Sequence, residues 1–369
     1  MVPTKKQISL PNLRKTMDLR ENSEGPTFPS TRFVGSKAKI VDRIWDCTGG
    51  LCYDTVLDAF GGTGCFSYIS KKKKKETYFN DILSFNYNVG LAIIENSHTT
   101  IRQNELQECL IPHEDFTYQR FIEKTFKGIY FNDAENRWLD VVTQNVHAID
   151  DPYKKALLLS ALGQSCLIKR PYNLFHRSNL NMRLRNVKRS FRNKKWWDAS
   201  FEVLFRRFVK EYNNCVFSNG RKNIALGGLD VFDLPTDFDL VYLDPPYMSA
   251  KSKKSGADYL AMYHFLEGLS SYCSWAERID FSRKNLGMKP VPEISAWRKR
   301  SGVIELLDKL IAKFSGSIIV FSYRSDGYPS RRKIFNLIKK NRGRKPQVFS
   351  IPYKYALSKE LTSELVFVA

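Results

Sequence analysis

The feature that most constrains the fold is a short apolar run, residues 239–243, which leads directly into Asp244, Pro245, Pro246 and Tyr247. An apolar run bounded by prolines predicts a buried strand, because proline cannot donate to a sheet and turns the chain out of it. The four residues then stand at the carboxyl end of that strand. Open α/β sheets bind ligands at this edge, so we expect an α/β fold with its site there.

This tetrad has the chemistry of a pocket for a planar amine. Asp244 and the carbonyl of Pro245 accept hydrogen bonds, and Tyr247 offers a flat surface on which a base can stack. A proline-rich turn capped by an aromatic residue would have the same sequence. The tetrad alone therefore leaves a functional and a structural interpretation equally open, and other motifs must decide between them.

A second strand is predicted at residues 55–58, where the chain turns through Gly61, Gly62 and Gly64 into a helical pattern. Glycines at such a turn let a ligand approach the backbone, and the acid at the strand end, Asp58, can hold a polar or cationic group. The spacing is neither the GxGxxG fingerprint nor a phosphate-binding P-loop, since no Gly-Lys-Ser/Thr follows. A glycine-rich turn with a purely structural role is the alternative.

Two further acids follow predicted strands. Asp81 closes the run 78–81, at the distance from the glycines where an acid meets ribose hydroxyls in nucleotide-binding α/β units. Asp230 closes the run 223–230 and is followed by Val231, a pair that suits the amino group and the face of an adenine ring. Acids at several strand ends favour a nucleotide pocket over the structural alternative.

The charge balance indicates a polyanionic partner such as nucleic acid. The 369-residue chain carries 59 Lys and Arg against 38 acids, a net charge of +21. Seven scattered cysteines without a CxxC pair predict neither a disulfide framework nor a structural zinc site, and no metal is expected. Because the chain has no signal-like start and no long apolar run, we expect a cytoplasmic protein without membrane spans.

More than half of the excess charge falls within residues 169–222, which carry 15 Lys and Arg against three acids. The alternation of strands and helices is lost from about residue 101 to residue 221, and apolar spacing predicts helices over 118–168. In the basic window, Asn, Arg and aromatic side chains are interleaved and can contact phosphates and base edges. The candidate DNA contacts are Lys169, Arg170, Tyr172, Asn173, His176, Arg177, Asn179, Asn181, Arg183 and Arg185.

Several shorter segments complete the pattern. The lysine run 71–75 fits a solvated helix end as well as a DNA contact. Residues 248–256 are expected to form a basic lid loop, and residues 281–300 a polar surface loop. A further strand is predicted at 317–322, a helix around 334–338, and a closing antiparallel pair at 347–353 and 364–368.

In order and content these motifs resemble the Dam-type, alpha-group DNA adenine N6-methyltransferases. The resemblance implies an α/β, Rossmann-like methyltransferase fold with a seven-stranded, mostly parallel sheet and an inserted, mainly helical target-recognition domain. It implies an N-terminal arm at residues 1–30, a discontinuous catalytic domain at 31–100 and 222–369, and the recognition domain at 101–221.

The resemblance also assigns roles to residues. Asp244, Pro245, Pro246 and Tyr247 correspond to the catalytic tetrad, unaltered, and Val231 stands where the family has Phe. The residues implied for the cofactor, S-adenosylmethionine (SAM), are Arg32, Phe33, Gly35, Lys37, Asp58, Phe60, Gly61, Gly62, Thr63, Gly64, Asp81, Ile82, Asp230 and Val231.

The implied activity is methyl transfer from SAM to the N6 amino group of a flipped-out adenine in double-stranded DNA, by a bacterial or phage-encoded enzyme. A cognate restriction endonuclease is then a candidate partner. Two alternatives stay open: an amino-methyltransferase acting on RNA adenine or cytosine N4, and a DNA-binding module with a degenerate pocket. The aspartate in first place favours adenine in DNA, and intact Asp58, Asp81 and Asp244 argue against degeneracy.

Overall fold

The computed structural model describes residues 25–185, 194–250, 256–353 and 362–369. Most of the expected arm and the central part of the expected lid loop lie outside these residues. The described end of the arm, residues 25–30, has no regular secondary structure. It still packs against the protein, because the Phe28 ring meets Tyr68 edge-on at 5.3 Å between centroids.

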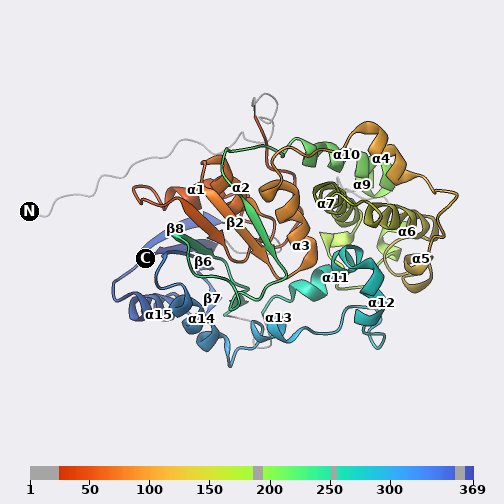
Figure 1. Cartoon of the computed structure of the whole chain (residues 1–369). Coiled ribbons are helices and arrows are strands. Elements are labelled where there is room, and N and C mark those ends of the chain that lie inside the picture. Colours follow the sequence, from red (N-terminus) through yellow and green to blue (C-terminus); the bar gives the residue numbers. More distant parts are fainter. Residues whose placement is uncertain (1–24, 186–193, 251–255, 354–361) are drawn as a thin grey trace, which may run out of the picture.

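A seven-stranded mixed sheet forms the centre of the molecule (Figure 1), in the order β3-β2-β1-β4-β6-β9-β8. Neighbouring strands pair in parallel except at β9, which runs antiparallel to both β6 and β8. This confirms the predicted α/β fold and the closing antiparallel pair. The strands are β1 (Thr55–Asp58), β2 (Glu76–Asp81), β3 (Ile224–Gly227), β4 (Leu240–Leu243), β6 (Ile318–Arg324), β8 (Gln347–Tyr353) and β9 (Thr362–Val368).

The strand order reverses between β1 and β4. From β1 the chain builds outward through β2 to β3, and it then returns to the other side of β1 as β4. Such a switch point leaves a crevice outside the carboxyl ends of the two strands. Asp58 ends β1 and Asp244 directly follows β4, so the fold brings both acids to this crevice.

Helices cover both faces of the sheet, which is why β4 is apolar throughout. Leu240 and Tyr242 pack with α1 and α2 on one face, whereas Val241 and Leu243 pack with α14 and α15 on the other. The helices beside the sheet are α1 (Val41–Asp46), α2 (Cys65–Lys72), α3 (Ser84–Val89), the π-helix η1 (Gly90–Glu95), α14 (Val303–Lys313) and α15 (Arg331–Arg342).

A helical lobe is inserted between η1 and β3 and lies beside the sheet (Figure 1). Its central helix is α7, which is buried along most of its length and contacts α3, η1, α6, α10 and α11. Asp151 starts α7 by accepting hydrogen bonds from two backbone N–H groups of its first turn. The lobe contains α4 (Gln103–Leu110), α5 (Phe121–Thr125), α6 (Asp133–His147), α7 (Pro152–Ile168), η2 (Pro171–Asn173), α8 (Asn181–Leu184), α9 (Lys194–Asp198) and α10 (Phe201–Asn213).

Helix α7 carries the chain from the amino edge of the sheet to the carboxyl edge. In its first turn the Tyr153 hydroxyl donates to Glu95 Oε1 at 2.9 Å, and Glu95 also accepts from the backbone of Ala225 in β3. Near its other end, Gln164 Oε1 accepts from the N–H of Arg32 at 3.3 Å. The basic loop that follows α7 therefore stands at the carboxyl edge, beside the crevice.

Residues 281–300 do not form only the polar surface loop that we expected. They include α13 (Pro292–Ala296), and Trp297 directly after it is 4% exposed. The indole packs edge-on against Phe60 and parallel to Phe232, at 5.5 and 6.2 Å between centroids. The polar composition of the segment concealed this single aromatic anchor. The other elements after β4 are β5 (Met248–Ser249), paired with β7 (Gly327–Tyr328), and α11 (Tyr259–Ser270), η3 (Tyr272–Ser274) and α12 (Trp275–Arg278).

Within the described ranges no helix has the length and apolar character needed to cross a membrane. The same residues contain no group of three or more His, Cys, Asp or Glu side chains arranged to hold a metal ion.

The contact between α11 and α12 gives a test of the packing. A Cβ added to Gly268 would lie 1.8 Å from the ring of Trp275, which is fully buried. We expect Gly268→Ala to lower the free energy of unfolding by about 1–3 kcal/mol, as overpacked cores do, in urea denaturation of the full chain. Gly163→Ala in α7 is the matched control, because its nearest neighbour would lie at 3.7 Å. An unchanged unfolding midpoint for Gly268→Ala would show that this contact is not rigid.

Candidate active site

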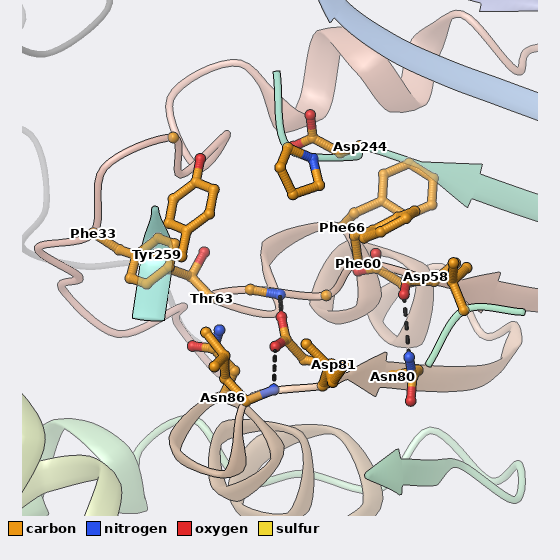
Figure 2. A pocket seen from close by; sticks show the side chains of 18 of the residues that line it. Phe33, Asp58, Phe60, Thr63, Phe66, Asn80, Asp81, Asn86, Asp244 and Tyr259 are labelled. Carbon is orange, nitrogen blue, oxygen red and sulfur yellow. Dashed lines mark hydrogen bonds between the residues drawn. The ribbon is translucent and has the colours of Figure 1, made fainter. Parts of the chain in front are cut away.

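One pocket lies at the carboxyl edge of the sheet, and most residues implied for SAM line it (Figure 2). Asp244 and Pro246 of the tetrad line the same pocket. Segments far apart in the sequence thus meet in one cavity. The implied SAM residues that line it are Phe33, Gly35, Lys37, Asp58, Phe60, Gly61, Gly62, Thr63, Asp81, Ile82, Asp230 and Val231.

The glycine-rich turn has a conformation that other residues would not accept. Gly62 and Gly64 have φ values of +53° and +73°, in the left-handed region that favours glycine. A Cβ on Gly61 would lie 2.0 Å from the ring of Phe79. The turn can therefore lie directly on β2 only with glycine at this position. Gly64 itself does not line the pocket but precedes the first turn of α2.

Asp81 joins this turn to the chain after β2. Its Oδ2 accepts from the N–H of Gly62 and its Oδ1 from the N–H of Leu83, both at 2.9 Å (Figure 2). Burial raises the pKa of Asp81 to about 6, although these two backbone donors favour the charged form. Each oxygen has a second lone pair, so the fixed carboxylate can also accept hydroxyl groups of a ligand.

Asp58 offers a buried acceptor. Its Oδ2 accepts from the backbone N–H and the hydroxyl of Ser67, at 3.2 and 2.7 Å. Its Oδ1 is buried without a hydrogen-bond partner among the described residues, and burial raises the pKa of Asp58 to about 7. A buried oxygen without a donor is costly in a folded protein. A positively charged or N–H-bearing part of a ligand would satisfy it, and SAM carries an ammonium group.

The predicted adenine-binding pair, Asp230 and Val231, lies beyond the end of its strand and not at the strand end as we expected. Strand β3 ends at Gly227, so Asp230 and Val231 belong to the loop that follows it rather than to the strand. Asp230 Oδ1 accepts from the N–H of Phe232 at 2.8 Å, and Val231 is 4% exposed. Both residues still line the pocket.

The sequence did not indicate several lining residues. Tyr259, Glu293, Ile294 and Trp297 come from α11 and from the segment that we expected to be a surface loop. No motif marks them, because they reach the pocket only through the packing of distant elements. The additional apolar and aromatic surface suits the flat ring of a nucleoside.

Asp244 is held by a buried ion pair. Lys37 Nζ lies 2.5 Å from Asp244 Oδ2, and the two side chains are 3% and 16% exposed. Asp244 Oδ1 is buried and has no hydrogen-bond partner in the described part of the chain. Burial raises the pKa of Asp244 to about 6 although the Lys37 charge opposes that rise. One oxygen is thus oriented by a cation while the other is left for a ligand.

The rest of the tetrad lies around this carboxylate. Pro245 and Tyr247 are absent from the residues that line the pocket. The Tyr247 ring meets Tyr323 edge-on at 6.1 Å, and the Lys37 ammonium and the Arg324 guanidinium lie 5.7 and 5.3 Å from its centroid. Burial raises the pKa of the Tyr247 phenol, so the ring is uncharged near neutral pH.

A comparison with known proteins identifies the family to which the chain belongs. The family model for D12 class N6 adenine-specific DNA methyltransferases matches residues 33–269. The chain belongs to this family. It is also 30% identical over 362 residues to type II methyltransferase M2.HphI of Haemophilus parahaemolyticus, a match that covers 93% of this chain and 98% of that protein. The protein is thus a SAM-dependent methyltransferase that acts on adenine N6 in DNA, which resolves the alternatives that the sequence left open.

In this methyltransferase the segment before α1 is held over the pocket by aromatic residues of α11. The Phe33 ring stacks on Tyr263 and Tyr259, at 4.4 and 5.5 Å between centroids, and the N–H of Val34 donates to the Tyr263 hydroxyl at 2.7 Å. Contrary to our expectation, Arg32 does not line the pocket. Its guanidinium lies 5.8 Å from the ring centroid of Phe208 in α10, so it connects this segment to the helical lobe.

The structure corrects the DNA contacts expected for Lys169, Arg170 and Arg183. Lys169 and Arg170 are 2% and 1% exposed, and the Arg183 side chain is 4% exposed. Lys169 and Arg183 both pair with Glu135, at 3.0 and 2.6 Å. These side chains cannot reach DNA, because they are enclosed within the helical lobe of the methyltransferase.

Arg170 supports the loop that follows α7. Its guanidinium donates to the carbonyl oxygens of Tyr130, Leu174 and Arg177 and to the Asn179 side chain. Asn179, which was expected to read a base, is thus an acceptor for Arg170. Of the other candidate contacts, Asn173 is half-buried, and the exposed members are Tyr172, His176, Arg177, Asn181 and Arg185.

The lysine run 71–75 lies at the wrong edge for contact with a flipped base. It joins the end of α2 to the start of β2, which is the amino edge of the sheet. Lys71 is buried and donates to the carbonyls of Ile93 and Asn96, at 3.2 and 2.8 Å. The placement of the run favours a helix end over a DNA contact.

A basic group that the sequence analysis did not single out lies at the carboxyl edge. Arg331, Arg332 and Lys333 form the first turn of α15, and all three are exposed. Because β6 runs parallel to β4 and β7 follows it, α15 begins on the side of the pocket. Cations are unfavourable at a helix amino terminus, so stability of α15 does not explain them.

We expect Asp81→Asn to weaken SAM binding by about 1.5–3 kcal/mol, because an amide cannot accept as a charged carboxylate does. Titration calorimetry on the full chain would measure this loss. Asp54→Asn is the matched control, since its side chain is 73% exposed at the other edge of the sheet. Equal SAM affinity in the two variants would remove Asp81 from the cofactor site.

Proposed function

We propose that this chain is a site-specific methyltransferase that takes one adenine out of duplex DNA and methylates its amino group against Asp244. The observation that carries the proposal is the state of this carboxylate: Lys37 holds Oδ2, while Oδ1 is buried without a partner among the described residues. The amino group of a stacked, paired adenine could not reach such an acceptor, so the base must be flipped out.

The proposed mechanism depends on hydrogen bonds that the tetrad accepts. The adenine amino lone pair is delocalised into the ring, and it becomes available when the amino protons donate to Asp244 Oδ1 and to the carbonyl of Pro245. SAM supplies an already activated methyl group, so positioning and electrostatics are the main demands on the protein. Tyr247 would provide the surface on which the flipped base stacks.

We also propose how the protein is divided. Residues 31–100 and 222–369 form the catalytic domain, and residues 101–221 form the target-recognition domain. The exposed members of the loop after α7, among them Tyr172 and Arg177, are the candidate readers of sequence. Arg331, Arg332 and Lys333 would contact backbone phosphates near the same pocket, because exposed cations there favour a polyanion.

The similarity to a type II methyltransferase also bears on a protein partner. A similar protein in Haemophilus parahaemolyticus is named a type II methyltransferase. From this similarity we infer that the present enzyme modifies the DNA of its own cell and protects it from a cognate restriction endonuclease.

The mechanism predicts that Asp244→Asn lowers the methylation rate by about 100-fold or more, because the amide cannot accept as the carboxylate does. DNA affinity should change little, since phosphate contacts dominate it. Transfer of labelled methyl groups to DNA measures the rate, and nucleoside mass spectrometry of the wild-type product should show N6-methyladenine. Methylation of RNA or of cytosine in preference to DNA adenine would refute the proposal, and so would full activity of Asp244→Asn.

The exposed residues that follow α7 lead to a different prediction. Arg177→Ala and Asn181→Ala should each relax preference at particular target positions, at a cost of about 1–3 kcal/mol in discrimination. Lys73→Ala, at the opposite edge of the sheet, should leave the methylated motif unchanged. Sequencing of methylated sites in an oligonucleotide library would compare them. If only the lysine variant alters the motif, the recognition surface is misplaced.

A further inference from the structure

A second carboxylate is buried beneath the ion pair at the active site. Glu364 on β9 is fully buried, and its Oε1 lies 3.7 Å from Lys37 Nζ. The same ammonium lies 2.5 Å from Asp244 Oδ2. The Lys37 cation is therefore placed between two carboxylates that are 120 positions apart in the sequence, one directly after β4 and one on β9.

The position of Glu364 in its strand is unusual. Val366 and Val368 follow it at alternate positions of β9, so they point to the same side, and both are buried in the apolar cluster that α1 and α2 cover. An acid among these buried valines is costly to desolvate unless it is well paired. Ser322 on β6 donates its hydroxyl to Glu364 Oε1 at 2.8 Å, and Lys37 supplies the charge. A valine would stabilise the sheet more simply, so the acid calls for a functional explanation.

The reaction itself moves positive charge toward this cluster. Methyl transfer breaks the bond between the sulfonium sulfur and the methyl carbon, and the sulfur keeps the electron pair. The adenine amino lone pair forms the new bond to carbon, and the nitrogen becomes positive until one of its protons leaves to water. Negative charge close to that nitrogen stabilises the transition state. An ammonium bound to Asp244 alone would cancel much of the charge that the carboxylate offers.

We propose that Glu364 is a positioning residue for methyl transfer, which shares the Lys37 ammonium with Asp244 and so keeps the Asp244 carboxylate strongly negative toward the adenine amino group. The same contact fixes Lys37 against Oδ2 and leaves Oδ1 for the base. This role rests on the proposed function of Asp244, and it assigns to β9 a part in the chemistry.

The direction of a pH effect follows from the charges. Asp244 must be ionised to accept from the amino group, and the Glu364 charge raises the pKa of Asp244, in addition to the effect of burial. Removing that charge should lower the pKa of Asp244, so the acid limb of the rate profile moves to lower pH while the plateau rate falls. A role limited to folding would not move the limb. Among the described residues, the other titratable or charged groups around the cluster include Asp58, Cys65, Tyr242, Tyr247, Tyr259, Arg324 and Tyr353.

The experiment compares Glu364→Gln with Ser322→Ala. Glutamine retains an oxygen for the Ser322 hydroxyl but removes the charge, whereas Ser322→Ala removes the hydrogen bond and keeps the charge. Single-turnover methylation of a DNA substrate at saturating SAM is measured across pH for both variants and for the wild type. We expect Glu364→Gln to lower the plateau rate by about tenfold to 100-fold and to shift the acid limb downward, with SAM and DNA affinities unchanged. Ser322→Ala should retain the wild-type limb.

Three results would overturn the role of Glu364: an unchanged plateau and acid limb in Glu364→Gln, a limb that moves to higher pH, or an equal effect in Ser322→Ala. Glu364→Asp keeps the charge and should hold the acid limb near its wild-type position, so it provides the same test if glutamine prevents folding. Absence of N6-methyladenine in the wild-type product would instead refute the proposed function. The proposed function is therefore tested first. It is supported if the wild type methylates DNA adenine and the Asp244→Asn variant is inert, and the Glu364 variants are then compared.

Discussion

The contact between Lys37 and Asp244 is the interaction on which the site depends, because it joins two parts of the chain that are 207 positions apart. Both side chains are largely buried, and a buried charge is tolerated only when it is paired. The pair can form only if β4 ends beside the segment that precedes α1. The reversal of strand order between β1 and β4 gives this arrangement, and the segment is held by the stacking of Phe33 on Tyr259 and Tyr263 of α11.

The pocket also contains polar atoms that a fold built only for stability would avoid. Asp58 Oδ1, Asn80 Oδ1, Asn86 Oδ1 and Asp244 Oδ1 are all buried without a partner among the described residues, and all four residues line this one cavity. Each unmet acceptor costs stability, so their gathering in one place indicates a ligand that satisfies them. The raised pKa values of Asp58, Asp81 and Asp244 have the same origin, since burial disfavours charge before the ligand arrives.

The sheet and much of the site were predictable, because a buried strand followed by an acid is a local pattern. Asp58, Asp81 and Asp244 could be assigned in this way, and the parallel sheet then brings them to one edge. Trp297 and Glu364 could not, because their importance comes from packing between distant elements. A period-two strand pattern gives no reason to treat one acid near the start of β9 as part of an active site that is formed mainly by other strands.

The helical lobe shows that the number of Lys and Arg residues in a segment does not give the number of cations on its surface. Lys169, Arg170 and Arg183 contribute to the excess charge of residues 169–222, but they are enclosed and bind carbonyl oxygens or Glu135. Of these three, Arg170 donates to the carbonyl oxygens of Leu174 and Arg177 in the loop after α7, so the exposed Arg177 projects from a supported backbone. Base readout needs donors at fixed positions, and fixing them costs less in binding when the loop is already ordered. These buried cations support the interior of the lobe, so fewer cations are available for phosphate contacts than the composition implies.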